Sequence, residues 1–131
     1  MAVDLRVLTN TDRGFYALLG PVLSRRDIER ELGARVHDDD GKVWFVAVDG
    51  RELLGFCAAL GTPRSVRLVS DYVLPAHRGR GVYRQLFAAR LAHYPDRPMT
   101  ATCTAAGLHT YRANGFYEVR ARGAYVDVAR G

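Results

Sequence analysis

The chain has 131 residues and a formal net charge of +5; 48% of its residues are hydrophobic and 25% are charged. This length predicts one domain, residues 1–131, with a single buried core, and it leaves too few residues for two. No apolar run approaches the roughly 20 residues of a membrane span, and the N-terminal residues lack the layout of a secretory signal. We therefore expect a cytoplasmic globular protein with no membrane partner.

The basic residues are almost all arginines, since only Lys42 among the 19 is a lysine, and they stand against 14 acidic residues. They are scattered and form neither a basic tract nor a stripe along one helix, which disfavours nucleic acid as a partner. The excess still suits a polyanionic ligand, because a positive field attracts phosphates. Cys57 and Cys103 lie in apolar runs typical of strands, so we interpret both as reduced core thiols.

The N-terminal part predicts a strand followed by two helices. The strand covers residues 3–8, and the first helix covers about residues 12–20, where Pro21 is expected to end it. A capping-box pattern over residues 24–27 predicts the start of a second helix, which covers about residues 25–35.

The middle of the chain is typical of buried strands. The three aspartates at residues 38–40, followed by Gly41, lack the alternating ligands of a calcium loop and are interpreted as a solvated turn. Residues 42–48 and 53–60 are apolar at nearly every position, which predicts two strands covered on both faces, and the Asp-Gly pair at residues 49–50 joins them as a hairpin. A further strand is predicted over residues 66–74.

A cationic glycine loop connects that strand to an amphipathic helix over about residues 82–94. Glycines allow successive N–H groups to point at one place, and the helix adds the positive end of its dipole, so the junction predicts a phosphate site. A Walker loop is excluded because Lys42 lies elsewhere, and a dinucleotide fingerprint fails because Arg84 stands where a third glycine is needed.

The C-terminal part predicts a strand, a short helix and a final hairpin. The strand ends near Cys103, the helix covers about residues 105–114 and Gly115 stops it. Strands then follow over about residues 116–122 and 125–129.

Two of these segments resemble motifs of the GNAT (GCN5-related N-acetyltransferase) superfamily. Residues 78–83 match the Arg-x-x-Gly-x-Gly/Ala loop, except that Tyr83 stands where a small residue is usual. Residues 111–116 match a Tyr-x-x-x-Gly-Phe helix end, while Thr104 replaces an asparagine often seen seven positions before the tyrosine. The resemblance covers nearly the whole chain. It implies an α/β fold with a central mixed sheet of six to seven strands, flanked by about four helices, in which strands 4 and 5 splay apart.

The resemblance implies an acetyl-CoA-dependent N-acetyltransferase without a metal. Acetyl-CoA would lie in the gap between strands 4 and 5, and a primary amine of a small molecule or protein would attack its carbonyl directly in a ternary complex. A homodimer is also compatible with the family. The residues that we assign to the cofactor are Val73, Leu74, Arg78, Gly79, Arg80, Gly81, Val82 and Tyr83.

Two residues are predicted to be catalytic. Tyr111 is the candidate general acid for the departing CoA thiolate, and its alternative is a packing role in the core. Asp71 is the candidate base, because it alternates with Val73 along the predicted strand, and its alternative is a salt bridge with an arginine.

Two other functions remain open at this point. Because Tyr83 and Thr104 depart from the family pattern, the domain is also compatible with binding acyl-CoA or a partner without catalysis. The net charge of +5 motivates a nucleic-acid-modifying relative of the fold, which the scattered arginines weaken.

Overall fold

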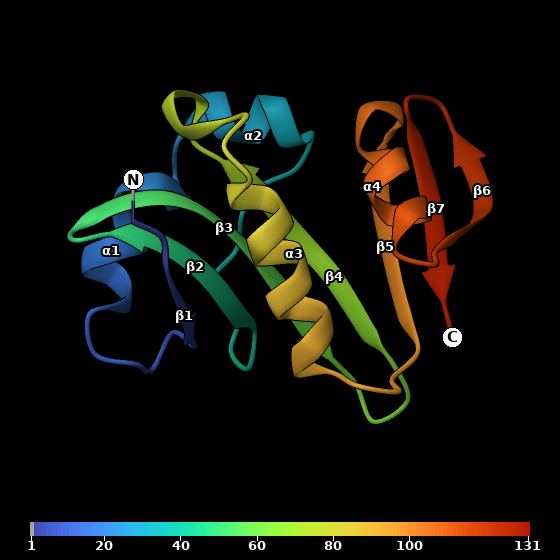
Figure 1. The fold of residues 1–131 in the computed structure, drawn as a ribbon, viewed down its shortest axis with the longest axis horizontal. Coiled ribbons are helices and arrows are strands. Elements are labelled where there is room, and N and C mark those ends of the chain that lie inside the picture. Colours follow the sequence, from blue (N-terminus) through green and yellow to red (C-terminus); the bar gives the residue numbers. More distant parts are fainter. Residues whose placement is uncertain (1) are drawn as a thin grey trace.

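The computed structural model describes residues 2–131, and its elements follow the predicted order. In chain order they are β1 (Asp4–Leu8), α1 (Phe15–Leu23), α2 (Arg26–Leu32), β2 (Val43–Asp49), β3 (Glu52–Gly61), β4 (Val66–Val73), η1 (Pro75–His77), α3 (Val82–His93), β5 (Met99–Thr104), η2 (Ala105–Gly107), α4 (Leu108–Ala113), β6 (Tyr117–Arg122) and β7 (Tyr125–Arg130). The strands form one seven-stranded sheet in the order β1-β2-β3-β4-β5-β7-β6, in which β4 and β5 are parallel (Figure 1). The predicted mixed sheet with four helices is confirmed.

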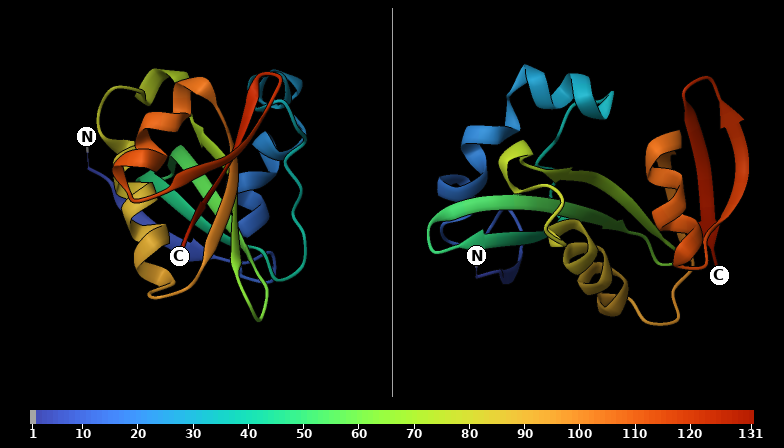
Figure 2. Two further views of the ribbon diagram at one scale, coloured as in Figure 1. Left: turned by 90° about the vertical axis from the view of Figure 1, so that its right-hand side faces the viewer. Right: turned by 45° about the horizontal axis from the view of Figure 1, so that its top comes forward.

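Helices cover the sheet on both faces, as the nearly continuous apolar character of β2 and β3 requires. Trp44, Val46 and Val48 point from β2 toward one face and pack with α1 and α2. Phe45 and Ala47 point to the opposite face and pack with α3. The right-hand view of Figure 2 shows α1 and α2 on one side of these strands and α3 on the other. Two hydrophobic cores therefore hold β1 to β4 between layers of helices.

The sheet opens between β4 and β5. These two strands pair only at their beginnings, where Val66–Leu68 face Met99–Ala101. Beyond this short ladder they diverge, and β5 continues with β6, β7 and α4 as a separate lobe (Figures 1 and 2). The predicted splay of strands 4 and 5 is confirmed.

Both N-terminal helices differ from their predicted bounds. Pro21 lies inside α1, which continues to Leu23, because the flanking Leu19 and Val22 are buried in the core and their packing outweighs one lost backbone hydrogen bond. Helix α2 ends at Leu32, three residues early, because Gly33 adopts a left-handed conformation (φ 74°) that closes the helix.

The capping box predicted over residues 24–27 does not form. The N-cap of α2 is Arg25, and its side chain makes no capping hydrogen bond. The carboxylate of Asp27 instead accepts hydrogen bonds from the Arg25 guanidinium, an ion pair that competes with the box. The helix is held by the buried Ile28 rather than by its cap.

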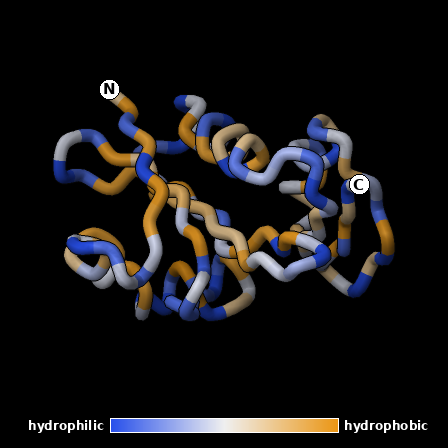
Figure 3. Tube along the Cα trace, turned by 90° about the horizontal axis from the view of Figure 1, so that it is seen from below, coloured by the Kyte–Doolittle hydropathy of each residue, from blue (hydrophilic) through white to orange (hydrophobic). Residues whose placement is uncertain are grey.

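Hydrophobic residues follow the strands that cross the middle of the molecule, and hydrophilic residues gather mainly in the loops and outer helix faces (Figure 3). Among residues 2–131, no helix is both long enough and apolar enough to cross a membrane.

Candidate functional site

A large cleft occupies the place where β4 and β5 diverge. Its volume is about 1590 Å³, and it is lined by β4, the loop before α3, α4 and the end of α2. Most residues that we predicted for the cofactor or for catalysis line it, namely Asp71, Val73, Arg78, Gly79, Gly81, Val82, Tyr83 and Tyr111. The structure therefore brings the two sequence motifs together around one cavity.

The glycine loop forms the entrance to α3. Gly79 and Gly81 have φ angles of 76° and 79°, a backbone conformation that residues other than glycine rarely adopt, and Gly81 is the N-cap of the helix. A side chain built on either glycine would meet no atom within 4 Å, so the backbone here is open to a ligand. The free N–H groups of the first helical turn make this end of α3 suitable for a phosphate.

The two arginines of the loop differ in their surroundings. Arg78 forms a salt bridge with Glu31 of α2 (2.7 Å), and its Nε donates to the carbonyl of Val73 (2.8 Å). Its charge is thereby partly used within the protein. Arg80 is exposed and makes no salt bridge within the described part of the chain. Of the two predicted phosphate ligands, Arg80 is the one whose charge is available.

The end of β4 presents one backbone donor to the gap. The N–H of Leu74 donates to the carbonyl of Leu54 in β3 (2.9 Å), so it is committed to the sheet. Neighbouring residues of a strand direct their backbone groups to opposite sides, which turns those of Val73 toward the gap. The pantetheine contact predicted for both residues is therefore compatible with the Val73 N–H and not with that of Leu74.

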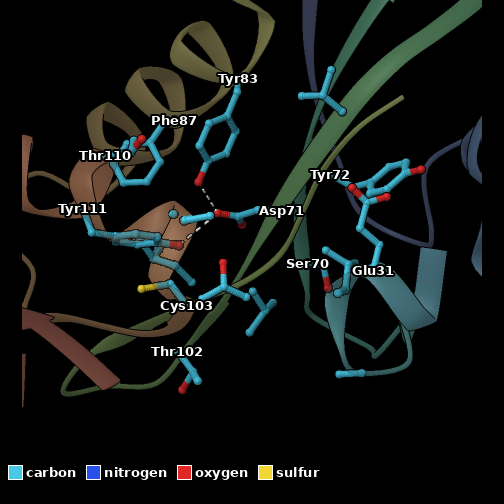
Figure 4. A pocket seen from close by; sticks show the side chains of 18 of the residues that line it. Glu31, Ser70, Asp71, Tyr72, Tyr83, Phe87, Thr102, Cys103, Thr110 and Tyr111 are labelled. Atoms are coloured by element: carbon cyan, nitrogen blue, oxygen red, sulfur yellow. Dashed lines mark hydrogen bonds between the residues drawn. The ribbon is translucent and has the colours of Figure 1, made fainter. Parts of the chain in front are cut away.

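Asp71 lies at the centre of a buried polar cluster, which we call the Asp71 cluster: Asp71, Tyr83, Arg90 and Tyr111. Arg90 of α3 is fully buried and holds both carboxylate oxygens, with Nη1 2.5 Å from Oδ1 and Nη2 3.0 Å from Oδ2. The hydroxyls of Tyr83 and Tyr111 donate to Oδ2 at 2.7 and 2.9 Å (Figure 4). The salt bridge considered as the alternative for Asp71 is thus present, and hydrogen-bond donors occupy both of its carboxylate oxygens.

Arg90 also explains why β4 can depart from regular geometry here. The register between β3 and β4 shifts next to Ala58, and Ser70 adopts a positive φ of 59°. Such a bulge leaves carbonyls without ladder partners, and Nη1 of Arg90 donates to those of Ala58 (3.1 Å) and Val69 (3.4 Å). Arg90 was missed at the sequence level, although it follows Leu86 by four positions on the apolar face of α3.

Tyr111 is both a packing residue and a member of the cluster. Its ring lies edge-on to Phe87 (5.0 Å between centroids) and to Phe116 (5.1 Å), and only 3% of the residue is exposed. Burial, and then the nearby Asp71 carboxylate, raise the pKa of Tyr111 above its ordinary value, and the same causes raise that of Tyr83. Both hydroxyls therefore keep their protons at neutral pH.

A second polar group faces the cleft from the opposite face of β4. Lys42 donates to the carbonyl of His37 (2.7 Å) and to Ser70 Oγ (2.9 Å), and burial lowers its pKa to about 8.

The two lobes touch on the α2 side, because Tyr125 of β7 fills the space that a side chain on Gly33 would occupy. The sequence offered no motif for these contacts, because they join residues far apart in the chain.

The remaining candidates have ordinary roles. Cys57 and Cys103 are free and buried, and burial raises the pKa of Cys57 to about 12, so its thiol is unreactive. His77, which also lines the cleft, has its Nε2 2.9 Å from Glu52 Oε1. Among residues 2–131, no three His, Cys, Asp or Glu side chains gather in a way that can hold a metal ion.

The chain is similar in sequence to one protein family and in fold to several solved structures. The sequence profile of the acetyltransferase (GNAT) domain family matches residues 39–118. No curated protein sequence matches the chain. Among solved structures, Escherichia coli ElaA superposes with a TM-score of 0.78 at 19% identity, covering 99% of this chain and 100% of that one.

Two further structures extend this likeness of fold. An acyl-CoA N-acyltransferase from Pseudomonas aeruginosa has a TM-score of 0.78 and 19% identity, and it covers 99% of this chain and 100% of its own. The PaiA N-acetyltransferase of Thermoplasma acidophilum, solved in complex with coenzyme A, has a TM-score of 0.65 and 12% identity, with 99% of each chain covered.

Proposed function

Because the chain belongs to the acetyltransferase (GNAT) domain family, we propose that it is an acetyl-CoA-dependent N-acetyltransferase. It would move an acetyl group to a primary amine of a small molecule or a protein by direct attack in a ternary complex. The observation that carries this proposal is the glycine loop at the start of α3, which opens into the cleft between β4 and β5. Acetyl-CoA enters as co-substrate, and no metal is required.

The loop and strand would position the thioester. The N–H groups at the start of α3 and the charge of Arg80 would hold the pyrophosphate, while Arg78 would support the loop through Glu31. The gap-facing N–H of Val73 would pair with the thioester arm and stabilise negative charge that develops on the acyl oxygen. Positioning and this donor would supply most of the catalysis.

Tyr111 would act as the general acid toward the leaving thiolate. It is protonated, it lines the cleft from the lobe that faces β4, and it is the tyrosine of the second sequence motif. Asp71, our candidate base, would instead hold the two tyrosines, because its oxygens are already occupied by donors. The acceptor amine would then lose its proton to solvent.

The first experiment tests the cofactor loop by calorimetry with acetyl-CoA. Gly81→Glu should abolish binding while the protein stays folded, because the new side chain would lie where the pyrophosphate packs. Gly41→Glu is a matched control, since Gly41 has the same φ of 79° and the same open surroundings but lies in the turn before β2. Equal affinities of the two variants would refute the assignment of the loop.

The second experiment tests the chemistry with a thiol-release assay over a panel of primary amines. Tyr111→Phe keeps the ring and removes the proton, so kcat should fall roughly 10- to 1000-fold with little change in acetyl-CoA affinity. Wild-type turnover in this variant would return Tyr111 to its packing role.

A binding-only domain is the second candidate, and one observation favours it. The hydroxyl of Tyr111 is committed to Asp71, and Tyr83 adds a second hydroxyl at the position where the family usually has a small residue. Tight acetyl-CoA binding without release of thiol to any amine in the panel would support this candidate over the enzyme.

A further inference from the structure

In the Asp71 cluster, a single carboxylate oxygen, Oδ2 of Asp71, receives three hydrogen-bond donors, which is one more than it can accept in good geometry. Oδ2 of Asp71 receives Arg90 Nη2 at 3.0 Å, Tyr83 Oη at 2.7 Å and Tyr111 Oη at 2.9 Å. Oδ1 receives only Arg90 Nη1 among side-chain donors. A carboxylate oxygen offers about two lone-pair directions, so three donors on Oδ2 leave one of them in surplus.

The three donors come from different sides of the cleft. Arg90 and Tyr83 both belong to α3, which packs on β4, the strand of Asp71. Tyr111 alone reaches Asp71 from α4, in the lobe beyond the divergence of β4 and β5 (Figure 4). A ligand that enters the gap would lie between these two sides. Its entry would therefore break the hydrogen bond that crosses the gap, from Tyr111 to Asp71.

We propose that Tyr83 is a positioning residue that keeps Asp71 Oδ2 satisfied while Tyr111 turns its hydroxyl from Asp71 to the sulfur of CoA. This rests on the proposed function, and it gives the unusual tyrosine of the glycine motif a role. Oδ2 retains Tyr83 and Arg90 after Tyr111 leaves, so the release exposes no buried lone pair.

The same reasoning predicts the effect of removing the Tyr83 hydroxyl. Tyr111 would then be one of only two donors on Oδ2, and its departure would leave this buried oxygen with Arg90 alone. The interaction with sulfur should weaken about 5- to 100-fold, the range expected for a buried acceptor that loses a needed partner. Tyr83→Phe keeps the ring that packs against Phe87, so the fold should be preserved.

The experiment compares binding of CoA and desulfo-CoA at pH 9 by calorimetry, because their affinity ratio isolates the contribution of the sulfur. In the wild type, CoA should bind at least 10-fold more tightly than desulfo-CoA. Tyr111→Phe should bring the ratio close to one, Tyr83→Phe should lower it at least 5-fold or to near one, and the double variant should match Tyr111→Phe. Tyr83→His, which keeps a ring donor, should restore part of the ratio.

A purely structural Tyr83 would predict a different pattern, in which Tyr83→Phe weakens both ligands equally and leaves the ratio unchanged. That result would overturn the inference, as would a wild-type ratio of one. In either case the wild type still binds CoA and the proposed function stands. Failure of the wild type to bind either ligand would overturn both proposals together.

Discussion

The two lobes of the sheet carry their charges in opposite ways. On the β4 side, Arg90 is fully buried and its partner Asp71 has a side chain that is 19% exposed. On the hairpin of β6 and β7, Asp127 has a similar side-chain exposure of 20%, but it binds Arg120 and Arg122, whose side chains are 66% and 52% exposed. The first network lies under the cleft between a strand and a helix, and the second lies at the surface of an open hairpin.

This difference determines how firmly each lobe is held in one geometry. A buried charge pair with several hydrogen bonds allows only one geometry, because any displacement leaves a charge or a carbonyl without a partner. An exposed pair exchanges with water at little cost. Under the proposed function, the lobe of β4 and α3 would hold the cofactor in one fixed arrangement, whereas the hairpin, joined through a short parallel ladder and Tyr125, would adapt to the acceptor.

The largest effect should come from breaking the buried network. Arg90→Met removes the partner of the Asp71 carboxylate and the donor to two bulge carbonyls, so we expect a loss of about 3 to 5 kcal/mol in the free energy of unfolding. Arg122→Met, the matched change in the exposed network, should leave the free energy of unfolding close to that of the wild type. Urea unfolding measures both.

The double variant Asp71→Leu with Arg90→Met sharpens the comparison. It removes both charges together, so it should recover part of the stability lost in Arg90→Met alone. Equal losses for Arg90→Met and Arg122→Met would show that burial does not separate the two networks.

These networks also mark the limit of what the sequence could predict. The order of the elements, the fully buried β2 and β3 and the glycine loop followed from local patterns, because apolar periodicity and turn residues act over short distances. Tyr111 and Asp71, which the sequence predicts to be catalytic, both line one cleft. Their mutual hydrogen bond and the role of Arg90 could not be derived, because they depend on how α3 and α4 meet across the splayed strands.

The helix ends show the same limit from another side. Burial of Leu19 and Val22 overruled the helix end predicted at Pro21, and α2 is held by the buried Ile28 although the capping box over residues 24–27 is lost to the Arg25–Asp27 ion pair. Local propensity is a matter of about 1 to 3 kcal/mol, and a well-buried apolar side chain contributes a similar amount, so several of them together decide the outcome.

The second effect concerns pH and the buried Lys42 of the β4 lobe. Its pKa is lowered by burial to about 8, whereas an unfolded lysine titrates near 10.4. Between these values the unfolded state binds more protons, so stability should rise as pH increases from 8 to 10, by about 1 to 3 kcal/mol. The difference in unfolding free energy between wild type and Lys42→Met, followed over this range, isolates the effect, and a constant difference would exclude it.

The third effect concerns the contact that joins the lobes on the α2 side. Gly33→Ala places a methyl group where the Tyr125 hydroxyl lies and adds strain at a φ of 74°, so we expect a loss of about 1 kcal/mol or somewhat more. Gly41→Ala is the control, because it carries similar strain (φ 79°) with no neighbour to displace. If the hairpin serves the acceptor, Gly33→Ala should also raise KM for the amine and leave that for acetyl-CoA unchanged, and equal behaviour of both variants would remove the hairpin from this role.

The smallest effect is expected for the exposed network itself. Arg122, then Thr102, lower the pKa of Asp127 below its ordinary value, so the stabilisation is present above the unfolded pKa of about 3.9 and is lost as pH falls through the folded value. The melting temperature of Asp127→Asn should therefore lie slightly below that of the wild type at pH 7, and the gap should close in acid and in high salt. Arg90→Met should keep its deficit in high salt, because a buried pair is screened little. A gap for Asp127→Asn that is as large as that for Arg90→Met and insensitive to salt would mean that the hairpin is held as rigidly as the β4 lobe, and its proposed freedom to adapt to the acceptor would then have no basis.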